Sequence, residues 1–147
     1  MYFDDMQVGA SAVTGSFEVT AEEVATFAQR WDPMPMHLNA TAAQALGMET
    51  LSAPSALTFS IKQRLLHQFP FVPAVVAAAG YEAVRFPKPL YAGRRVRLHM
   101  EVQQARPSQS RPDRGVVTLR LRLVTDCEET VLDYLDIILV RRRSASA

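Results

Sequence analysis

The stretch RVRLHMEV, from Arg95 to Val102, alternates polar and apolar residues without a break. A period of two is typical of a β-strand that has one face on a core and the other in solvent. The same alternation recurs over residues 117–123, and residues 131–140 and 74–86, the latter interrupted by Gly80, are also rich in strand-forming residues. We therefore expect four long strands in the second half of the chain.

The first half of the chain has helical patterns instead. Thr20 and Glu23 have the spacing of a capping box, which predicts a helix from Ala21 to Trp31. Asn39 is a suitable N-cap for a short helix ending near Gly47. A longer helix is expected between Pro54 and Pro70, with apolar or small residues on most of its faces.

Helices followed by antiparallel strands indicate an α+β fold, in which a curved sheet wraps around the long apolar helix. This arrangement is the hot-dog fold. With 147 residues the chain has room for a single domain, 1–147, of which we expect 141–147 to be a flexible polar tail. One such sheet leaves an edge strand and an apolar rim uncovered, so we expect a homodimer or a higher homo-oligomer.

Composition excludes several classes of protein. The net charge of +1 gives no global field that would attract nucleic acid, so no nucleic-acid partner is expected. The longest apolar stretches, such as residues 73–80, are far shorter than the roughly 20 residues that cross a bilayer, so no membrane segment is expected. A single cysteine, Cys127, and the absence of a signal-peptide pattern predict a cytoplasmic location.

Asp32 and His37 are the first candidate catalytic residues. A carboxylate and an imidazole that lie close together can share acid and base duties on one water molecule. The two prolines between them, Pro33 and Pro35, predict a stiff loop that would hold both side chains in one geometry. The alternative is that Asp32 only caps a turn and that His37 is a packing residue.

Ser55 and Ala56, at the start of the long helix, are the second candidate site. Free backbone amides and the positive end of the helix dipole can polarise a thioester carbonyl there. The small residues around them could equally serve only to permit tight packing. Arg85 and Lys88 belong to a basic cluster that would suit the phosphates of coenzyme A, although a solvated strand face with interspersed charges is the more common explanation of such a cluster.

No metal site or cofactor is expected. Cys127, His67 and His99 are isolated from one another in the sequence, and Asp32 with His37 does not supply three clustered ligands. The chain also lacks a Gly-x-Ser-x-Gly elbow and a glycine-rich phosphate loop.

Four ordered motifs resemble the MaoC-like dehydratase family, which includes the (R)-specific enoyl-CoA hydratases. The opening FDDMQVG (3–9), the Val19-Thr20 segment, DPMPMH (32–37) and VRFPKPLYAG (84–93) each have a counterpart there. The resemblance implies that Asp32 and His37 orient one water that adds to the double bond of a 2-enoyl thioester. It also implies that an amide of Ser55 or Ala56 binds the thioester oxygen, with coenzyme A present only as part of the substrate.

Two departures from the family pattern keep other functions open. Met34 replaces an asparagine or glutamine, and Pro54 and its neighbours replace a glycine-containing segment. A hot-dog thioesterase acting on acyl-CoA is one alternative. A non-catalytic protein that binds an acyl-CoA or an acyl-carrier thioester is the other.

Overall fold

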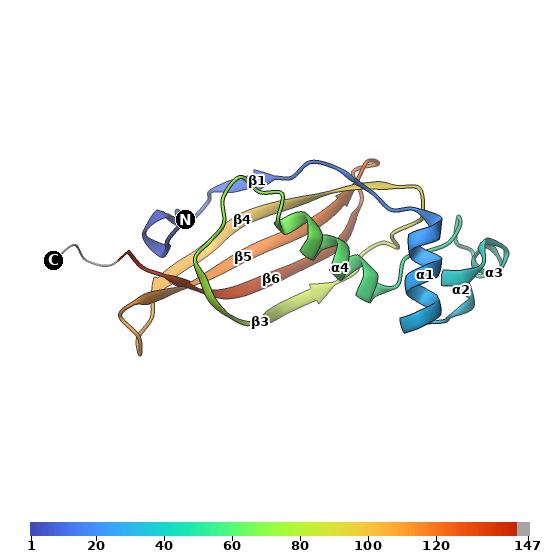
Figure 1. The fold of residues 1–147 in the computed structure, drawn as a ribbon. Coiled ribbons are helices and arrows are strands. Elements are labelled where there is room, and N and C mark those ends of the chain that lie inside the picture. The colour runs from blue at the N-terminus through green and yellow to red at the C-terminus, as the bar shows by residue number, and fades with distance from the viewer. Residues whose placement is uncertain (144–147) are drawn as a thin grey trace.

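The computed structural model describes residues 1–143. These residues form a curved antiparallel sheet in the order β1-β4-β5-β6-β3, with the short β2 also pairing with β4 (Figure 1). The elements along the chain are η1 (Phe3–Asp5), β1 (Ser11–Val13), β2 (Phe17–Glu18), α1 (Ala21–Trp31), α2 (Pro35–Leu38), α3 (Ala40–Ala45), α4 (Ser55–Leu66), β3 (Val75–Arg85), β4 (Arg95–Pro107), β5 (Arg114–Thr125) and β6 (Thr130–Arg141).

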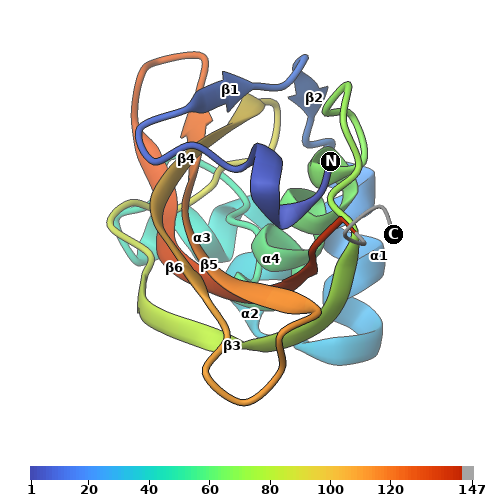
Figure 2. The same ribbon diagram turned by 90° about the vertical axis from the view of Figure 1, so that its left-hand side faces the viewer.

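The sheet curves around α4, as Figure 2 shows. The alternation that predicted β4 is confirmed, because Val96, Leu98, Met100 and Val102 are all buried while the residues between them are at least partly exposed. α4 contributes Leu57, Ile61 and Leu65 to the same core. The α+β arrangement expected from the sequence is therefore the observed one.

Side-chain caps start two of the helices where the sequence predicts them. The Thr20 side chain accepts a hydrogen bond from the Glu23 amide at the start of α1, and the Asn39 side chain accepts one from the Ala42 amide at the start of α3. These bonds satisfy amide donors that have no partner within the helix. α4 starts at Ser55 after Pro54, and it ends at Leu66, four residues before Pro70.

The expected stiff loop from Asp32 to His37 is wrong in one respect, because its second half is the one-turn helix α2. Pro35 occupies the first position of this helix. A proline is tolerated there because its missing amide hydrogen would have no partner in the first turn anyway.

The expected tail over residues 141–147 is wrong for its first three residues. Arg141 is the last residue of β6, the Arg143 amide donates to Asp4, and the Arg143 guanidinium pairs with Asp5. Polar composition alone did not reveal these partners, because they are at the opposite end of the chain. Residues 144–147 lie outside the described residues.

β3 forms one edge of the sheet, pairing with β6 on one side (Figure 2). Its register is shifted at three places, one of them between Ala78 and Gly80, where the sequence suggested an interruption. Val75, Tyr81 and Val84 of this strand are between 41 and 50% exposed. Within residues 1–143, no helix is long and apolar enough to cross a membrane.

Candidate active site

Asp32 follows the last residue of α1 and caps this helix. Its backbone amide donates to the Ala28 carbonyl at 3.0 Å. Its side chain is 40% exposed, so the carboxylate remains in contact with solvent. The capping role considered for Asp32 is thus real for its backbone, and it leaves the side chain free.

His37 belongs to α2, which is tied to the segment preceding α4. The Ser52 amide donates to the Met36 carbonyl at 3.3 Å, and the His37 ring lies 2.6 Å through Nδ1 from the Ser52 carbonyl oxygen. The ring is only 8% exposed. Burial and the contact with the Ser52 carbonyl therefore fix the orientation of this imidazole.

The structure brings Asp32 and His37 together. His37 Nε2 lies 3.6 Å from Asp32 Oδ2. A carbonyl oxygen can only accept a hydrogen bond, so Nδ1 must carry the proton that it donates to Ser52. Neutral His37 consequently presents the lone pair of Nε2 toward the carboxylate.

A separation of 3.6 Å is too long for a direct hydrogen bond between Nε2 and Oδ2. One water molecule placed to the side of the line between these atoms could contact both at hydrogen-bond distance. The lone pair of Nε2 and the carboxylate are both proton acceptors in this state, so each can accept a hydrogen bond from that water. The arrangement can therefore orient and deprotonate a water molecule.

Ser55 and Ala56 are exposed at the first two positions of α4. The first intrahelical bond comes from the Thr58 amide to the Pro54 carbonyl, and no side chain caps this end of the helix. The amides of Ser55 and Ala56 are thus available to an external acceptor such as a carbonyl oxygen. In Figure 1 this end of α4 faces α1, α2 and α3, which carry or flank Asp32 and His37.

Met34, between Asp32 and His37, is 47% exposed. Arg85 and Lys88, the candidates for phosphate contact, are both exposed, at the end of β3 and in the turn that follows. In the described part of the chain they form no ion pair and do not join the Asp32 and His37 pair. Their role in binding phosphates stays a prediction.

Two features escaped the sequence interpretation. One is Ser52, which holds the His37 ring from 15 positions away, a pairing for which no spacing rule exists. The other is a buried polar group formed by Lys62, Tyr134 and Asp136, which are 1, 1 and 7% exposed. A signal for it existed, since Lys62 interrupts an apolar helix and Asp136 interrupts the buried face of an apolar strand. The described residues contain no cluster of three or more His, Cys, Asp or Glu that could hold a metal ion.

Comparison with known proteins agrees with the fold and the motifs. The family model of the MaoC-like domain matches residues 6–124. A MaoC-like dehydratase from Rhodospirillum rubrum is 29% identical, with a TM-score of 0.90 over 99% of both chains. An (R)-hydratase from A. caviae involved in PHA biosynthesis is 26% identical, with a TM-score of 0.72 over 91% of this chain and 96% of the other.

A third structure shares the fold alone. It is a Mycobacterium tuberculosis protein described as having a double hot-dog fold, 19% identical, with a TM-score of 0.83 over all of this chain and 46% of the other. A search of curated proteins gave no match. The family match and the hydratase neighbour support hydratase or dehydratase activity. By the match over most of its length, the chain belongs to the MaoC-like dehydratase family and has its hot-dog fold.

Proposed function

We propose that this protein hydrates the double bond of a 2-enoyl thioester, or dehydrates the corresponding 3-hydroxyacyl thioester, with Asp32 and His37 acting on one water. The observation that carries the proposal is the placement of His37 Nε2 at 3.6 Å from Asp32 Oδ2, while Nδ1 is bonded to the Ser52 carbonyl. The similarity to the A. caviae (R)-hydratase supports the reaction class.

In the hydration direction, His37 Nε2 takes a proton from the water as its oxygen forms a bond to C3 of the substrate. Asp32 accepts a hydrogen bond from the second water proton and so sets the direction of attack. The electron pair of the double bond moves onto the thioester oxygen, which the amides of Ser55 and Ala56 stabilise. C2 then takes the proton held on Nε2, and the thioester carbonyl re-forms. The net change is the addition of one water.

This reaction requires no cofactor, and coenzyme A would enter only as the carrier part of the substrate. Arg85 and Lys88 are proposed to contact its phosphates, since both cations are exposed beside the turn that follows β3. An acyl carrier protein is the alternative carrier, and the same two cations would then contact it. We propose the cytoplasm as the location of the reaction, as expected from the sequence.

We also propose that the protein is a homodimer joined through β3. This strand has an open edge within the described sheet and exposes Val75, Tyr81 and Val84. Open apolar edges are commonly covered by a second copy. Sedimentation should give the mass of a dimer for the unaltered protein and of a monomer for Val84→Lys; a monomeric unaltered protein would contradict this.

The activity is tested by following the loss of enoyl absorbance with crotonyl-CoA and a longer 2-enoyl-CoA. The unaltered protein should turn over at least one of them, and Asp32→Asn should be slower by about 100-fold or more. Asp126→Asn is the matched control, since Asp126 is an exposed carboxylate in the turn between β5 and β6.

Equal rates for the unaltered protein and Asp32→Asn would contradict the proposal. Release of free thiol from a saturated acyl-CoA would instead indicate a thioesterase. Tight acyl-CoA binding with neither reaction would indicate a non-catalytic binding protein.

A further inference from the structure

A cavity of about 340 Å³ lies beside the C-terminal half of α4, between this helix and strands β3 and β6. We call it the distal chamber, defined by Leu66, Phe69, Phe71, Tyr81, Asp136 and Ile138. Its lining is mainly apolar, and Asp136 supplies the carboxylate in it. Such a lining suits a hydrocarbon chain that carries one polar group.

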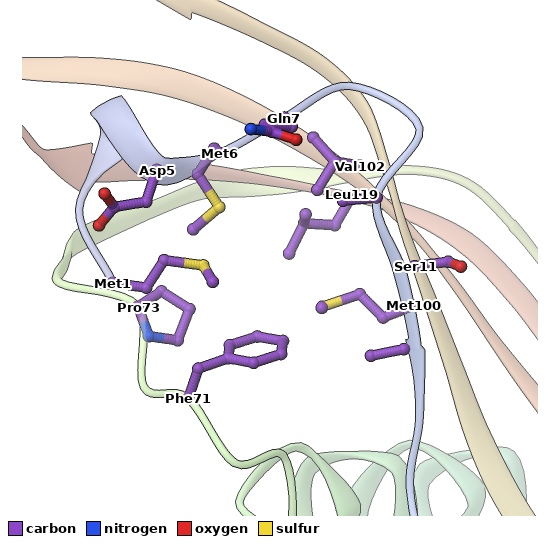
Figure 3. A pocket seen from close by; sticks show the side chains of 12 residues that line it. Met1, Asp5, Met6, Gln7, Ser11, Phe71, Pro73, Met100, Val102 and Leu119 are labelled. Carbon is purple, nitrogen blue, oxygen red and sulfur yellow. The ribbon is translucent and has the colours of Figure 1, made fainter.

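A smaller cavity of about 70 Å³ adjoins the distal chamber, since Phe71, Pro73, Met100 and Leu119 line both. Figure 3 shows the side chains of Met1, Met6 and Met100 and the Phe71 ring directed into this space, while the Asp5 carboxylate lies at its edge. Methionine side chains adapt readily to the shape of an apolar ligand. The two cavities together can therefore accommodate chains of more than one length.

Asp136 is an unusual wall residue. It is 7% exposed, and its Oδ1 has no hydrogen-bond partner. The Tyr134 hydroxyl is also buried and lies close to the Asp136 carboxyl, outside the lining of the chamber. A buried carboxylate without a full set of partners is costly, so a ligand that donates a hydrogen bond to Asp136 would be bound more favourably than one that cannot.

Lys62 places a positive charge near this carboxylate. Its ammonium donates to Gln63 Oε1 at 3.0 Å and lies 4.7 to 5.3 Å from the ring centres of Phe59, Tyr81 and Tyr134. Burial raises the pKa of Asp136 and lowers that of Lys62, and the attraction between the two charges opposes both shifts. Lys62 thus already supplies a positive charge near Asp136, so the ligand does not have to carry one.

The chamber lies within reach of a substrate held at the start of α4. Ser55, Phe59, Gln63 and Leu66 follow one another along one face of the helix, and all four are at least partly exposed. Gln63 borders the chamber and is eight residues from Ser55, which is about 12 Å along a helix. An extended chain advances roughly 1.2 Å per bond, so about ten bonds cover this distance.

We propose that the distal chamber receives the far end of the substrate's acyl chain and that Asp136 selects chains carrying a hydroxyl group there. This inference rests on the proposed function, because the same substrate must present its thioester to Ser55 and Ala56. The hydroxyl donates to the Asp136 carboxylate, which lines the chamber. A cationic group is disfavoured by Lys62, and a carboxylate by Asp136.

Binding measured by calorimetry with two saturated thioesters of matched size tests the inference. 10-Hydroxydecanoyl-CoA and undecanoyl-CoA differ by a hydroxyl in place of a methyl group, and neither has a double bond to hydrate. The unaltered protein should bind the hydroxylated thioester about ten-fold more tightly, as expected for one hydrogen bond to a charged group.

Two variants assign the preference to Asp136. In Lys62→Met with Asp136→Leu, both charges are replaced by apolar side chains of similar size, and undecanoyl-CoA should become the tighter ligand. If this double variant fails to fold, Asp136→Asn should reduce the preference by at least three-fold while keeping the shape of the side chain. Asp126→Asn should leave the preference unchanged.

Equal or tighter binding of undecanoyl-CoA by the unaltered protein would overturn the inference and would indicate that Asp136 is satisfied by water. If hydration of 2-enoyl-CoA is observed together with that result, only the selection of hydroxylated chains fails. If no acyl-CoA binds and none is hydrated, the proposed function fails as well.

Discussion

His37 Nδ1 lies 2.6 Å from the carbonyl oxygen of Ser52, whereas the Ser52 hydroxyl oxygen lies 3.4 Å from the same nitrogen. The backbone of Ser52, rather than its side chain, therefore determines the tautomer and the orientation of the ring. The ring in turn directs Nε2 toward Asp32. A main-chain group on the segment before α4 thus positions a side chain of α2.

This relationship predicts that Ser52→Ala is nearly harmless to activity. The carbonyl oxygen and its bond to Nδ1 remain, so kcat/KM for the 2-enoyl thioester should fall by no more than about three-fold. In His37→Gln, which removes the base itself, kcat/KM should fall by about 100-fold or more in the same assay. A drop of 100-fold in Ser52→Ala would show that the hydroxyl holds the ring.

A second prediction concerns Gly115, the second residue of strand β5. A Cβ at this position would overlap the ring of Phe3, because the ring packs directly against the glycine. Gly115→Ala should therefore lower the free energy of unfolding, measured in urea, by about 1–3 kcal/mol. Arg142, whose guanidinium carbon lies 5.8 Å from the centre of the Phe3 ring, would lose this contact too.

Phe3→Ala provides the control for Gly115→Ala. Once the ring is gone, adding the methyl group at Gly115 should change the stability by less than about 0.5 kcal/mol, because the three nearest atoms that the methyl group would meet all belong to the Phe3 ring. The same penalty in both backgrounds would mean that the strain originates in the backbone of β5 and not in the contact with Phe3.

A third prediction concerns pH and the two ends of the described chain. The amide of Arg143 holds the pKa of Asp4 below its ordinary value of 3.8, and the amide of Tyr2 does the same for Asp5, helped by the Arg143 side chain. A carboxylate with a lowered pKa stabilises the folded state above its ordinary pKa. This contribution is lost as the pH falls through the lowered value. The contact between the termini should therefore loosen only in acid below pH 3.8.

The amide resonances of Tyr2 and Arg143 report this titration by NMR. Both should move with apparent pKa values below 3.8. In Arg143→Gln the value from the Tyr2 amide should rise, because the guanidinium contact with Asp5 is removed, yet stay below 3.8, because the Tyr2 amide still donates. Midpoints at or above 3.8 in the unaltered protein would contradict the assigned hydrogen bonds.

Much of the fold could be predicted from the sequence because its signals are local. Each of these signals depends on residues within a few positions of one another: the alternation in β4, the caps at Thr20 and Asn39, and the apolar or small residues on most faces of α4. The helix α2 was missed because two prolines at a spacing of two resemble a loop, although Pro35 is suited to a first helical position.

The site could be predicted only in part for the same physical reason. Asp32 and His37 are five residues apart, so their proximity could be inferred, and the structure brings them together. The Ser52 carbonyl and the partners of Lys62 and Asp136 are brought close by the fold over long stretches of chain. The contacts of Arg143 with Asp4 and Asp5 join opposite ends of the chain, which no local pattern could indicate.

The account depends most on Asp32 and His37 acting on a single water. The most direct test is kcat/KM for the hydration of a 2-enoyl thioester by Asp32→Asn, His37→Gln and the protein with both changes. Groups that act as a unit give losses that do not multiply, so the double variant should be about as slow as the slower single variant. Losses that multiply, or full activity in either single variant, would contradict the shared water.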